Sequence, residues 1–229
     1  MENDERRACL QRMTGGTLRP GGLTLTTRAL ELCRMPPEAR VLDAGCGNGV
    51  TLRHLRERCG VRCCGLDLSM EMLAAARDED GEGSLVRARM EEIPFRNDAF
   101  QGVLCECVLS HTNAEVVVRE FSRIVEEGGF LILSDLYHLF PGSAAPPGME
   151  VLGRDWLEEC LARSGFDIVT WEDRTADLRR LAAELIMSGC SLPPYHVDPG
   201  AAPAKAFHDW RGIGYYLLVA RRTNDNQCR

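Results

Sequence analysis

The chain has 229 residues, 45% of them hydrophobic, which predicts one large domain with a full apolar core. Its formal net charge of −7 lacks the basic surface that broad nucleic-acid binding needs, so we expect no nucleic-acid partner. No apolar run reaches the roughly 18 residues of a membrane-spanning helix. The charged first segment, MENDERRACLQRM, lacks the apolar centre of a signal peptide, so we expect a cytoplasmic protein.

The first part of the chain predicts two helices separated by glycines and prolines. Residues 1–14 have the composition of a short charged helix, which TGGTLRPGG (residues 14–22) ends. A second helix is expected over residues 24–33, because the two prolines of MPPEAR stop it.

From residue 40 onward, strand patterns and helix patterns alternate. The expected strands are residues 40–45, 61–68, 84–90, 99–109, 129–137, 166–172 and 213–222. The expected helices cover residues 48–60, 70–77 and 113–127, then a stretch that ends at Gly165 and one that carries Leu178, Leu181 and Leu185. A loop rich in proline and glycine, residues 189–209, precedes the last strand.

This alternation predicts an α/β fold with a doubly wound, mostly parallel sheet that helices cover on both faces. Ligands of such sheets bind at the carboxyl ends of the strands, beside the first strand. The glycine-rich turn GCGNG (residues 45–49) falls at that place, directly after the first predicted strand. The sequence therefore predicts a ligand site at this turn.

The eleven cysteines are scattered along the chain, and none forms a CxxC pair. Several lie inside apolar runs, where a reduced thiol behaves as a small hydrophobic side chain (Cys63, Cys64, Cys105 and Cys107). The spacing predicts neither a disulfide framework nor a structural zinc site, and we expect no bound metal.

Two acidic residues near the glycine turn indicate what it binds. Asp67 ends the second predicted strand 20 residues after Gly47, the spacing at which a carboxylate reaches ribose hydroxyls. A glycine turn that binds a pyrophosphate would need glycine at position 50, where Val50 stands. The negative charge of a phosphate would also be repelled by the carboxylate of Asp43. A cationic nucleoside without phosphate fits better, and S-adenosylmethionine is such a ligand. The alternative is a tight turn without a ligand, with Asp43 and Asp67 serving as caps.

Three segments, VLDAGCGNG, GLDLSMEML and MEEIPFRNDAFQGVLCECVLSH, resemble those of class I S-adenosylmethionine-dependent methyltransferases. The chain is most similar to their small-molecule group, methyltransferase type 11, which includes quinone methyltransferases. The resemblance covers roughly residues 38–137. It implies a seven-stranded Rossmann-like sheet whose antiparallel last strand inserts between its neighbours. It also implies one domain with an N-terminal helical lid (1–37), a cofactor-binding half (38–137) and an acceptor-side half (138–229).

The resemblance assigns the cofactor contacts around the glycine turn. Gly45, Cys46 and Gly47 would approach the methionine and ribose portions of S-adenosylmethionine. Asp43 would help to hold the ammonium group, and Asp67 would accept hydrogen bonds from the ribose hydroxyls.

The adenine would lie against Leu68, and the family's loop at the adenine edge matches Met90 and Glu91. Arg89 departs from the family pattern, which often has an acid at that position. Adenine recognition there would then rely on backbone groups.

The end of the fourth predicted strand carries the residues expected nearest to the chemistry. Glu106 and Cys107 match positions beside the methionine and the transferred methyl, and Glu106 is either exposed at the strand's mouth or a paired buried acid. Core packing is the expected role of Cys105. His111 is a candidate general base, although a solvated loop histidine is about as common. Arg19 could meet the methionine carboxylate, with a surface arginine in a turn slightly favoured.

The methyl acceptor is not legible in the sequence. ECVLS stands where amino-group methyltransferases would carry an NPPY-type segment, so the resemblance favours a small molecule methylated at carbon or oxygen. Three alternatives are a metalloid or thiol methyltransferase, a non-catalytic module that binds S-adenosylmethionine, and a dinucleotide oxidoreductase. The oligomeric state is not encoded legibly either.

Overall fold

A computed structural model describes residues 16–17, 19–80, 84–143, 149–187 and 212–223 of the chain. The helix predicted over residues 1–14 and the loop predicted over residues 189–209 lie outside the described residues.

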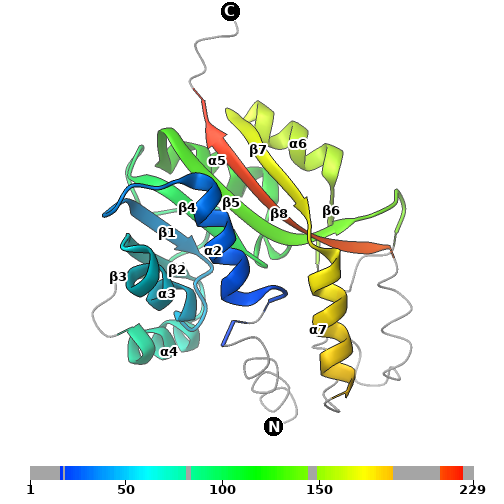
Figure 1. The fold of residues 1–229 in the computed structure, drawn as a ribbon. Helices are drawn as coiled ribbons and strands as arrows, with labels where there is room; N and C mark the ends of the chain where they lie inside the picture. The colour runs from blue at the N-terminus through cyan, green and yellow to red at the C-terminus, as the bar shows by residue number, and fades with distance from the viewer. Residues whose placement is uncertain (1–15, 18, 81–83, 144–148, 188–211, 224–229) are drawn as a thin grey trace, which may run out of the picture.

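The core is a sheet in which seven strands lie in the order β3-β2-β1-β4-β5-β8-β7, and β6 pairs with β5 outside this path (Figure 1). All pairings are parallel except those of β8, which runs antiparallel between β5 and β7. The strands are β1 (Arg40–Ala44), β2 (Arg62–Asp67), β3 (Ser84–Arg87), β4 (Phe100–Glu106), β5 (Val125–His138), β6 (Leu152–Gly153), β7 (Phe166–Asp173) and β8 (Ile213–Arg222). This confirms the doubly wound fold with an inserted antiparallel last strand, and it adds the short β6, which the sequence did not predict.

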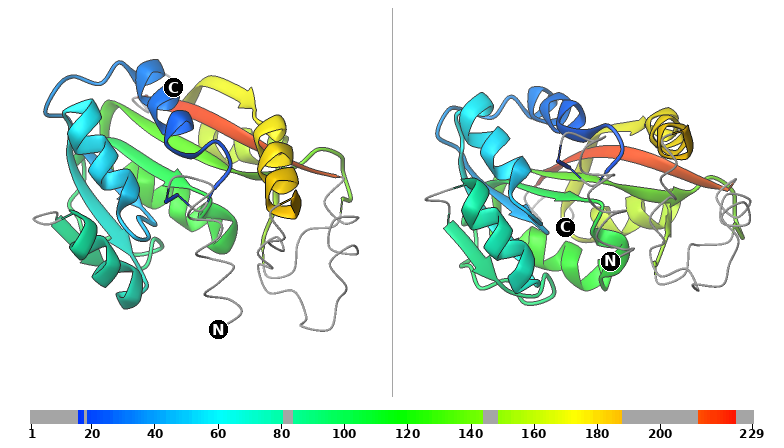
Figure 2. Two further views of the ribbon diagram at one scale, coloured as in Figure 1. Left: turned by 60° about the horizontal axis from the view of Figure 1, so that its bottom comes forward. Right: turned by 90° about the horizontal axis from the view of Figure 1, so that it is seen from below.

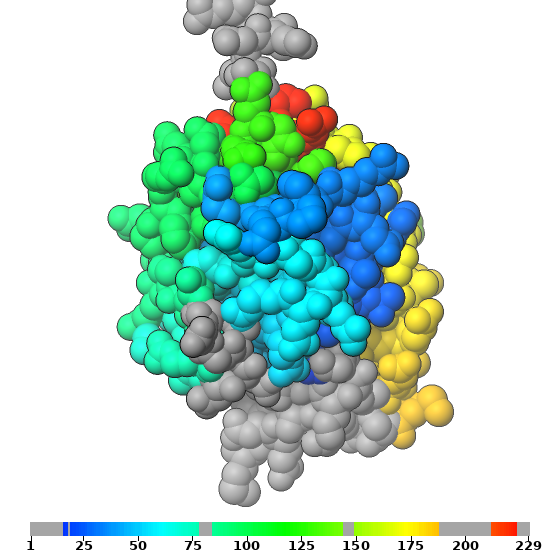
Figure 3. Space-filling view, turned by 60° about the vertical axis from the view of Figure 1, so that its left-hand side comes forward, coloured from blue at the N-terminus to red at the C-terminus, as the bar shows by residue number. Residues whose placement is uncertain are grey.

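Helices cover both faces of the sheet. One layer contains α2 (Gly22–Cys33), α3 (Val50–Cys59) and α7 (Thr175–Met187), and the opposite layer contains α5 (Ala114–Ile124) and α6 (Arg154–Arg163). Seen from below, α2 and α7 lie on one side of the sheet and α5 on the other (Figure 2). The helix α4 (Met70–Asp80) contacts α3, β2 and β3. In the space-filling view, the blue segment of α2 and its connection lies directly against the cyan α3 (Figure 3).

The helix α5 shows how the sequence pattern becomes packing. Asn113 caps its first turn by accepting the backbone N–H of Val116 at 3.3 Å, and four apolar side chains on one face are fully buried against the sheet (Val117, Val118, Phe121 and Ile124). The predicted end of this helix at Glu127 is wrong. Val125 is already extended and pairs with Phe100 as the first residue of β5, because its buried side chain belongs to the sheet.

Within the described ranges, no helix combines the length and the apolar character that crossing a membrane requires.

Candidate functional site

The glycine turn connects β1 to α3 at the carboxyl edge of the sheet, as the sequence predicts. It is tied to the neighbouring strand β2, because the backbone N–H groups of Gly45 and Cys46 both donate to the carbonyl oxygen of Leu66, at 2.7 and 3.0 Å. The side chain of Cys46 is buried and packs with Leu52 and Leu73.

The three glycines of the turn all have positive φ, but they serve different purposes. At Gly45 (φ 83°) an added Cβ would lie 2.6 Å from a methyl carbon of Val108, and at Gly49 (φ 79°) it would lie 2.9 Å from the Cβ of Ala76. At Gly47 (φ 53°) it would meet no atom within 4 Å. Gly45 and Gly49 are therefore needed for internal packing, whereas Gly47 keeps its backbone bare toward open space.

Asp67, at the end of β2, is hydrogen-bonded directly to the turn. Its Oδ2 accepts the backbone N–H of Gly47 at 2.9 Å, and its Oδ1 accepts that of Ser69 at 2.8 Å. Each carboxylate oxygen has a further lone pair, so Asp67 retains acceptor capacity for the hydroxyl groups of a ligand. The next side chain, Leu68, is 53% exposed and offers an apolar surface at the same edge.

Asp43 is buried at the end of β1, with 3% of its surface exposed. Burial, reinforced by Glu106, raises the pKa of Asp43 to about 7. Among the described residues, its Oδ2 has no hydrogen-bond partner. A buried acceptor without a donor is uncommon in a native fold, and a cationic donor group from a ligand would satisfy it.

Glu106, at the end of β4, forms a buried ion pair with Arg19. The Nη2 of Arg19 lies 2.7 Å from the Oε2 of Glu106, and Thr26 Oγ1 donates to the same carboxylate at 3.1 Å. Arg19 also donates to Thr51 Oγ1 at 3.2 Å. Glu106 is thus the paired buried acid, and the favoured reading of Arg19 as a surface arginine is wrong. The glutamate draws Arg19 inward, so only 7% of the arginine is exposed.

The loop before β4 carries Met90 and Glu91. Met90 is buried in the core, and the carboxylate of Glu91 lies 3.3 Å from the guanidinium of Arg89. Glu91 also accepts the backbone N–H of Asn113 at 3.3 Å, which ties this loop to the start of α5. The basic side chain at position 89 is therefore neutralised locally.

Cys107 follows β4 directly and has a φ of 58°, a left-handed conformation that is uncommon for a residue with a side chain. Its Sγ lies 3.2 Å from the hydroxyl of Tyr215 on β8, and its backbone N–H donates to Ser134 at 2.7 Å. Burial raises the pKa of the Cys107 thiol, which favours the neutral form. Cys105 is fully buried in the core, as predicted.

His111 ends the short 3-10 helix η1 (Leu109–His111) and is exposed. The preceding Ser110 is bound to the buried Asp135 twice, through its backbone N–H at 2.9 Å and its hydroxyl at 3.0 Å. Asp135 lies on β5, so this carboxylate fixes the turn that carries His111 to the adjacent strand.

A methyltransferase domain matches residues 42–133, which run from β1 into β5 and contain the glycine turn, Asp67 and Glu106. The strand order and the antiparallel β8 are those of the Rossmann-like methyltransferase sheet. Residues 42–133 therefore form a class I S-adenosylmethionine-dependent methyltransferase domain. The cofactor of this family is S-adenosylmethionine.

Relatives of this methyltransferase differ in how much of the chain they match. An O-methyltransferase of Pyrenophora dematioidea is 23% identical over 86% of this chain and 80% of the fungal protein. The uncharacterized methyltransferase YodH of Bacillus subtilis is 33% identical over 49% of this chain, which spans only 50% of that protein. The cyclase SpnF shares the fold, with a TM-score of 0.72 and 24% identity over 87% of this chain and 80% of SpnF. Two 18S rRNA methyltransferases, from Saccharomyces cerevisiae and Mus musculus, match 35% of this chain at 38% and 40% identity.

Several residues of the candidate site were not singled out from the sequence. Thr26, Thr51 and Asp135 are buried polar residues that complete the contacts of Arg19, Glu106 and the η1 turn. Thr51 lies 32 positions from Arg19, Thr26 lies 80 positions from Glu106, and Asp135 lies 25 positions from Ser110. The apolar surroundings of Asp135 in GFLILSDLY are the one signal that could have found it, because a lone carboxylate in a buried strand needs partners.

Two neighbouring tyrosines of β8 give a matched test of the hydrogen bonds that Tyr215 makes to Cys107 and Ser134. The hydroxyl of Tyr215 bonds to Cys107 and donates to Ser134 at 3.1 Å, whereas that of Tyr216 has no partner among the described residues. Tyr215→Phe is expected to lower the free energy of unfolding by about 1–2 kcal/mol, and Tyr216→Phe to leave it nearly unchanged. Urea unfolding of both variants measures this, and equal losses would contradict the assigned contacts.

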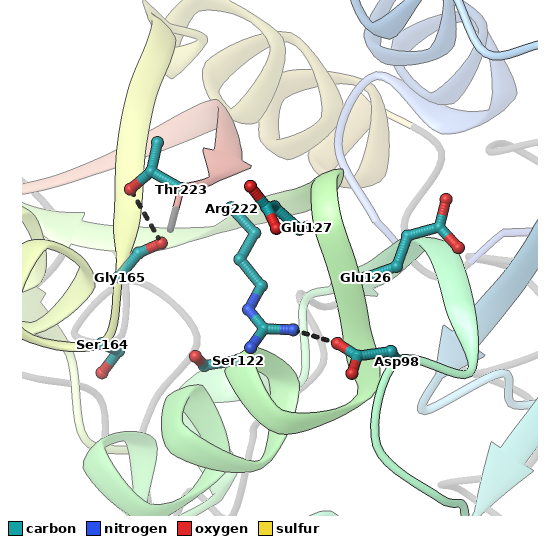
Figure 4. A pocket seen from close by; sticks show the side chains of 8 residues that line it. All are labelled: Asp98, Ser122, Glu126, Glu127, Ser164, Gly165, Arg222 and Thr223. Carbon is teal, nitrogen blue, oxygen red and sulfur yellow. Dashed lines mark hydrogen bonds and ion pairs between the residues drawn. The ribbon is translucent and has the colours of Figure 1, made fainter. Parts of the chain in front are cut away.

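A separate cavity of about 550 Å³ lies at the opposite edge of the sheet (Figure 4). Its lining comes from the residues just before β4 and β7, the start of β5 and the end of β8, and it contains the Arg222–Asp98 ion pair. Apart from the end of the antiparallel β8, these are the amino ends of strands, so this cavity is separate from the candidate site at the carboxyl edge.

Proposed function

We propose that this methyltransferase transfers the methyl group of S-adenosylmethionine to a small molecule, at a carbon or oxygen atom. Three observations carry the proposal: the open space at Gly47, the carboxylate of Asp67 that holds the Gly47 backbone and retains acceptor capacity, and the unpaired Oδ2 of Asp43 at the end of the preceding strand. This set of groups suits a cationic nucleoside and contains no phosphate-binding feature.

The cofactor roles follow from these positions. Asp67 would accept the ribose hydroxyls, and Asp43 the ammonium group of the cofactor. The bare backbone at Gly47, flanked by Gly45 and Cys46, would face the methionine and ribose portions.

The adenine would lie on the exposed Leu68, with Met90 and Glu91 at its edge. Glu106 and Cys107 would border the methionine end, where the acceptor approaches.

Bound S-adenosylmethionine supplies a methyl group on a positively charged sulfur, and an electron pair of the acceptor forms the new bond as the carbon–sulfur bond breaks. The protein's contribution is alignment, which is worth roughly 7–11 kcal/mol when reacting atoms are held near contact. An acceptor that loses a proton needs a base, and the exposed His111 on the anchored η1 turn is the candidate. Residues 138–229 would supply the acceptor side.

The net charge of −7 supports a small-molecule acceptor, and the O-methyltransferase relative supports oxygen as the methylated atom. Because two relatives are named as rRNA methyltransferases, RNA is included among the acceptors to be tested. A metalloid or thiol methyltransferase is less well supported, because burial disfavours the thiolate of Cys107. No cluster of three or more potential metal ligands occurs in the part of the chain that the structure describes.

Methyl-labelled S-adenosylmethionine tests the proposal against pools of small metabolites, RNA and protein. We expect label in the small-molecule fraction with an equal amount of S-adenosylhomocysteine released, and none with Asp67→Ala. Label in RNA would overturn the acceptor class.

Binding of S-adenosylmethionine without transfer of label to any fraction would favour a second function, that of a non-catalytic module that binds S-adenosylmethionine. The likeness to the cyclase SpnF shows that the fold is not confined to proteins named as methyltransferases.

A further inference from the structure

Two consecutive side chains at the end of β4 lie on the same face of the sheet. Side chains alternate along a strand, so Cys105 and Cys107 would ordinarily share one face. Instead, Cys105 packs in the core cluster beside α5 and α6, and Cys107 packs against the cluster beside α2 and α7. The latter face is the one on which Glu106 meets Thr26 of α2. The chain therefore reverses the alternation at Cys107.

The backbone of Cys107 accounts for this reversal. Its φ of 58° is left-handed, which is unfavourable for a residue with a side chain. Its N–H still donates to the carbonyl oxygen of Ser134 on β5 at 2.7 Å, so strand pairing continues up to the residue that turns. Such a conformation persists only where the surrounding structure holds it.

A chain of hydrogen bonds holds the side chain of Cys107. Its Sγ lies 3.2 Å from the hydroxyl of Tyr215 on β8, and this hydroxyl donates to the hydroxyl of Ser134 at 3.1 Å. Because a tyrosine hydroxyl has one proton, the thiol is the donor to Tyr215. Burial raises the pKa of the Cys107 thiol, so the proton that it donates is retained. The chain thus fastens the end of β4 to β8, across β5.

The conformation of Cys107 also decides where the following residues lie. The next residue, Val108, packs on the glycine turn, since a Cβ added at Gly45 would lie 2.6 Å from a methyl carbon of Val108. The short helix η1 begins at Leu109. One left-handed residue therefore sets how the segment after β4 meets the turn after β1.

We propose that Cys107 is a positioning residue for methyl transfer. Its hydrogen bond to Tyr215 holds the left-handed conformation, and this conformation keeps Val108 and η1 aligned with the glycine turn. The inference rests on the proposed function, in which the acceptor approaches at the end of β4. Alignment is where such a residue acts on the rate, because a misplacement of about 1 Å can cost about 100-fold.

Initial rates of transfer from methyl-labelled S-adenosylmethionine to a pool of small metabolites test the proposal. Cys107→Ala and Tyr215→Phe are each expected to lower the maximal rate at least about tenfold. The KM for S-adenosylmethionine should stay within about threefold of wild type, because the groups assigned to the nucleoside lie on β1 and β2. The double variant should be no slower than the slower single variant, since both substitutions remove the same hydrogen bond.

Two further substitutions at position 107 separate positioning from packing. Cys107→Ser keeps a donor for Tyr215 and should remain within about threefold of the wild-type rate. Cys107→Gly removes more atoms than Cys107→Ala, yet glycine adopts the left-handed conformation freely. The glycine variant should therefore be faster than the alanine variant. A residue that serves packing alone would give the reverse order.

Tyr216→Phe is the matched control, because the hydroxyl of Tyr216 has no partner among the described residues. Its maximal rate should equal that of wild type. All rates are measured at a temperature at which circular dichroism shows each variant to be folded. The proposal is wrong if Cys107→Ala transfers label at the wild-type rate, if Cys107→Gly is slower than Cys107→Ala, or if the losses of the two single variants multiply in the double variant. Each of these outcomes leaves the proposed function standing, which fails only if wild-type protein transfers no label.

Discussion

Gly45→Ala is expected to lower the free energy of unfolding by about 2–5 kcal/mol. A left-handed conformation costs a residue with a side chain about 1–2 kcal/mol, and overpacking typically adds about 1–3 kcal/mol. Both apply, because Gly45 has a φ of 83° and the new Cβ would lie 2.6 Å from a methyl carbon of Val108. The branched side chain of Val108 has little rotamer freedom with which to move away. Urea unfolding of the cofactor-free protein measures the loss.

Gly47→Ala is the matched comparison within the same turn. Its φ of 53° imposes the conformational cost, but its Cβ would meet no atom within 4 Å, so we expect a loss of only about 1–2 kcal/mol. Binding of S-adenosylhomocysteine should instead weaken by about tenfold or more, because the added methyl group would enter the space that we propose for the ligand.

The double variant Gly45→Ala/Val108→Ala provides the control, since removing the valine methyl groups should recover part of the lost stability. Equal destabilisation by Gly45→Ala and Gly47→Ala would contradict the division of roles between the two glycines.

Asp67→Ala is expected to abolish most of the stabilisation that the cofactor gives. At about 100 times its dissociation constant, S-adenosylmethionine should stabilise wild-type protein by about 2.7 kcal/mol. Without the carboxylate the ribose hydroxyls lose their acceptor, and the N–H groups of Gly47 and Ser69 lose the group that holds the turn. Thermal unfolding with and without cofactor measures the gain in each protein.

Glu71→Ala is a suitable control, because Glu71 is an exposed carboxylate in the first turn of α4, close to Asp67 in sequence. Its cofactor response should equal that of wild type. A full response in Asp67→Ala would refute the ribose assignment.

The sequence by itself determined the fold class, and it predicted the place of the candidate site. Alternating strand and helix patterns predicted the parallel sheet, and the last strand was predicted with the bounds that β8 has, residues 213–222. The glycine turn and Asp67 could be read because they are local features: glycine spacing follows from backbone geometry, and a residue that ends a strand lies at the sheet edge.

Only the tertiary structure decided which residues complete the site. Arg19 and Glu106 are 87 positions apart and meet beside Thr26 of α2, which donates to Glu106 at the end of β4, a contact that no periodicity encodes. Likewise, Gly45 is required for packing and Gly47 is not, because Val108 lies against Gly45 alone. The end of α5 was predicted wrongly at Val125. This residue is apolar and fits the helix pattern, but it pairs with Phe100 and belongs to the sheet. Local preference sets elements and turns, whereas the pairing of buried charges and the fit of side chains depend on long-range packing.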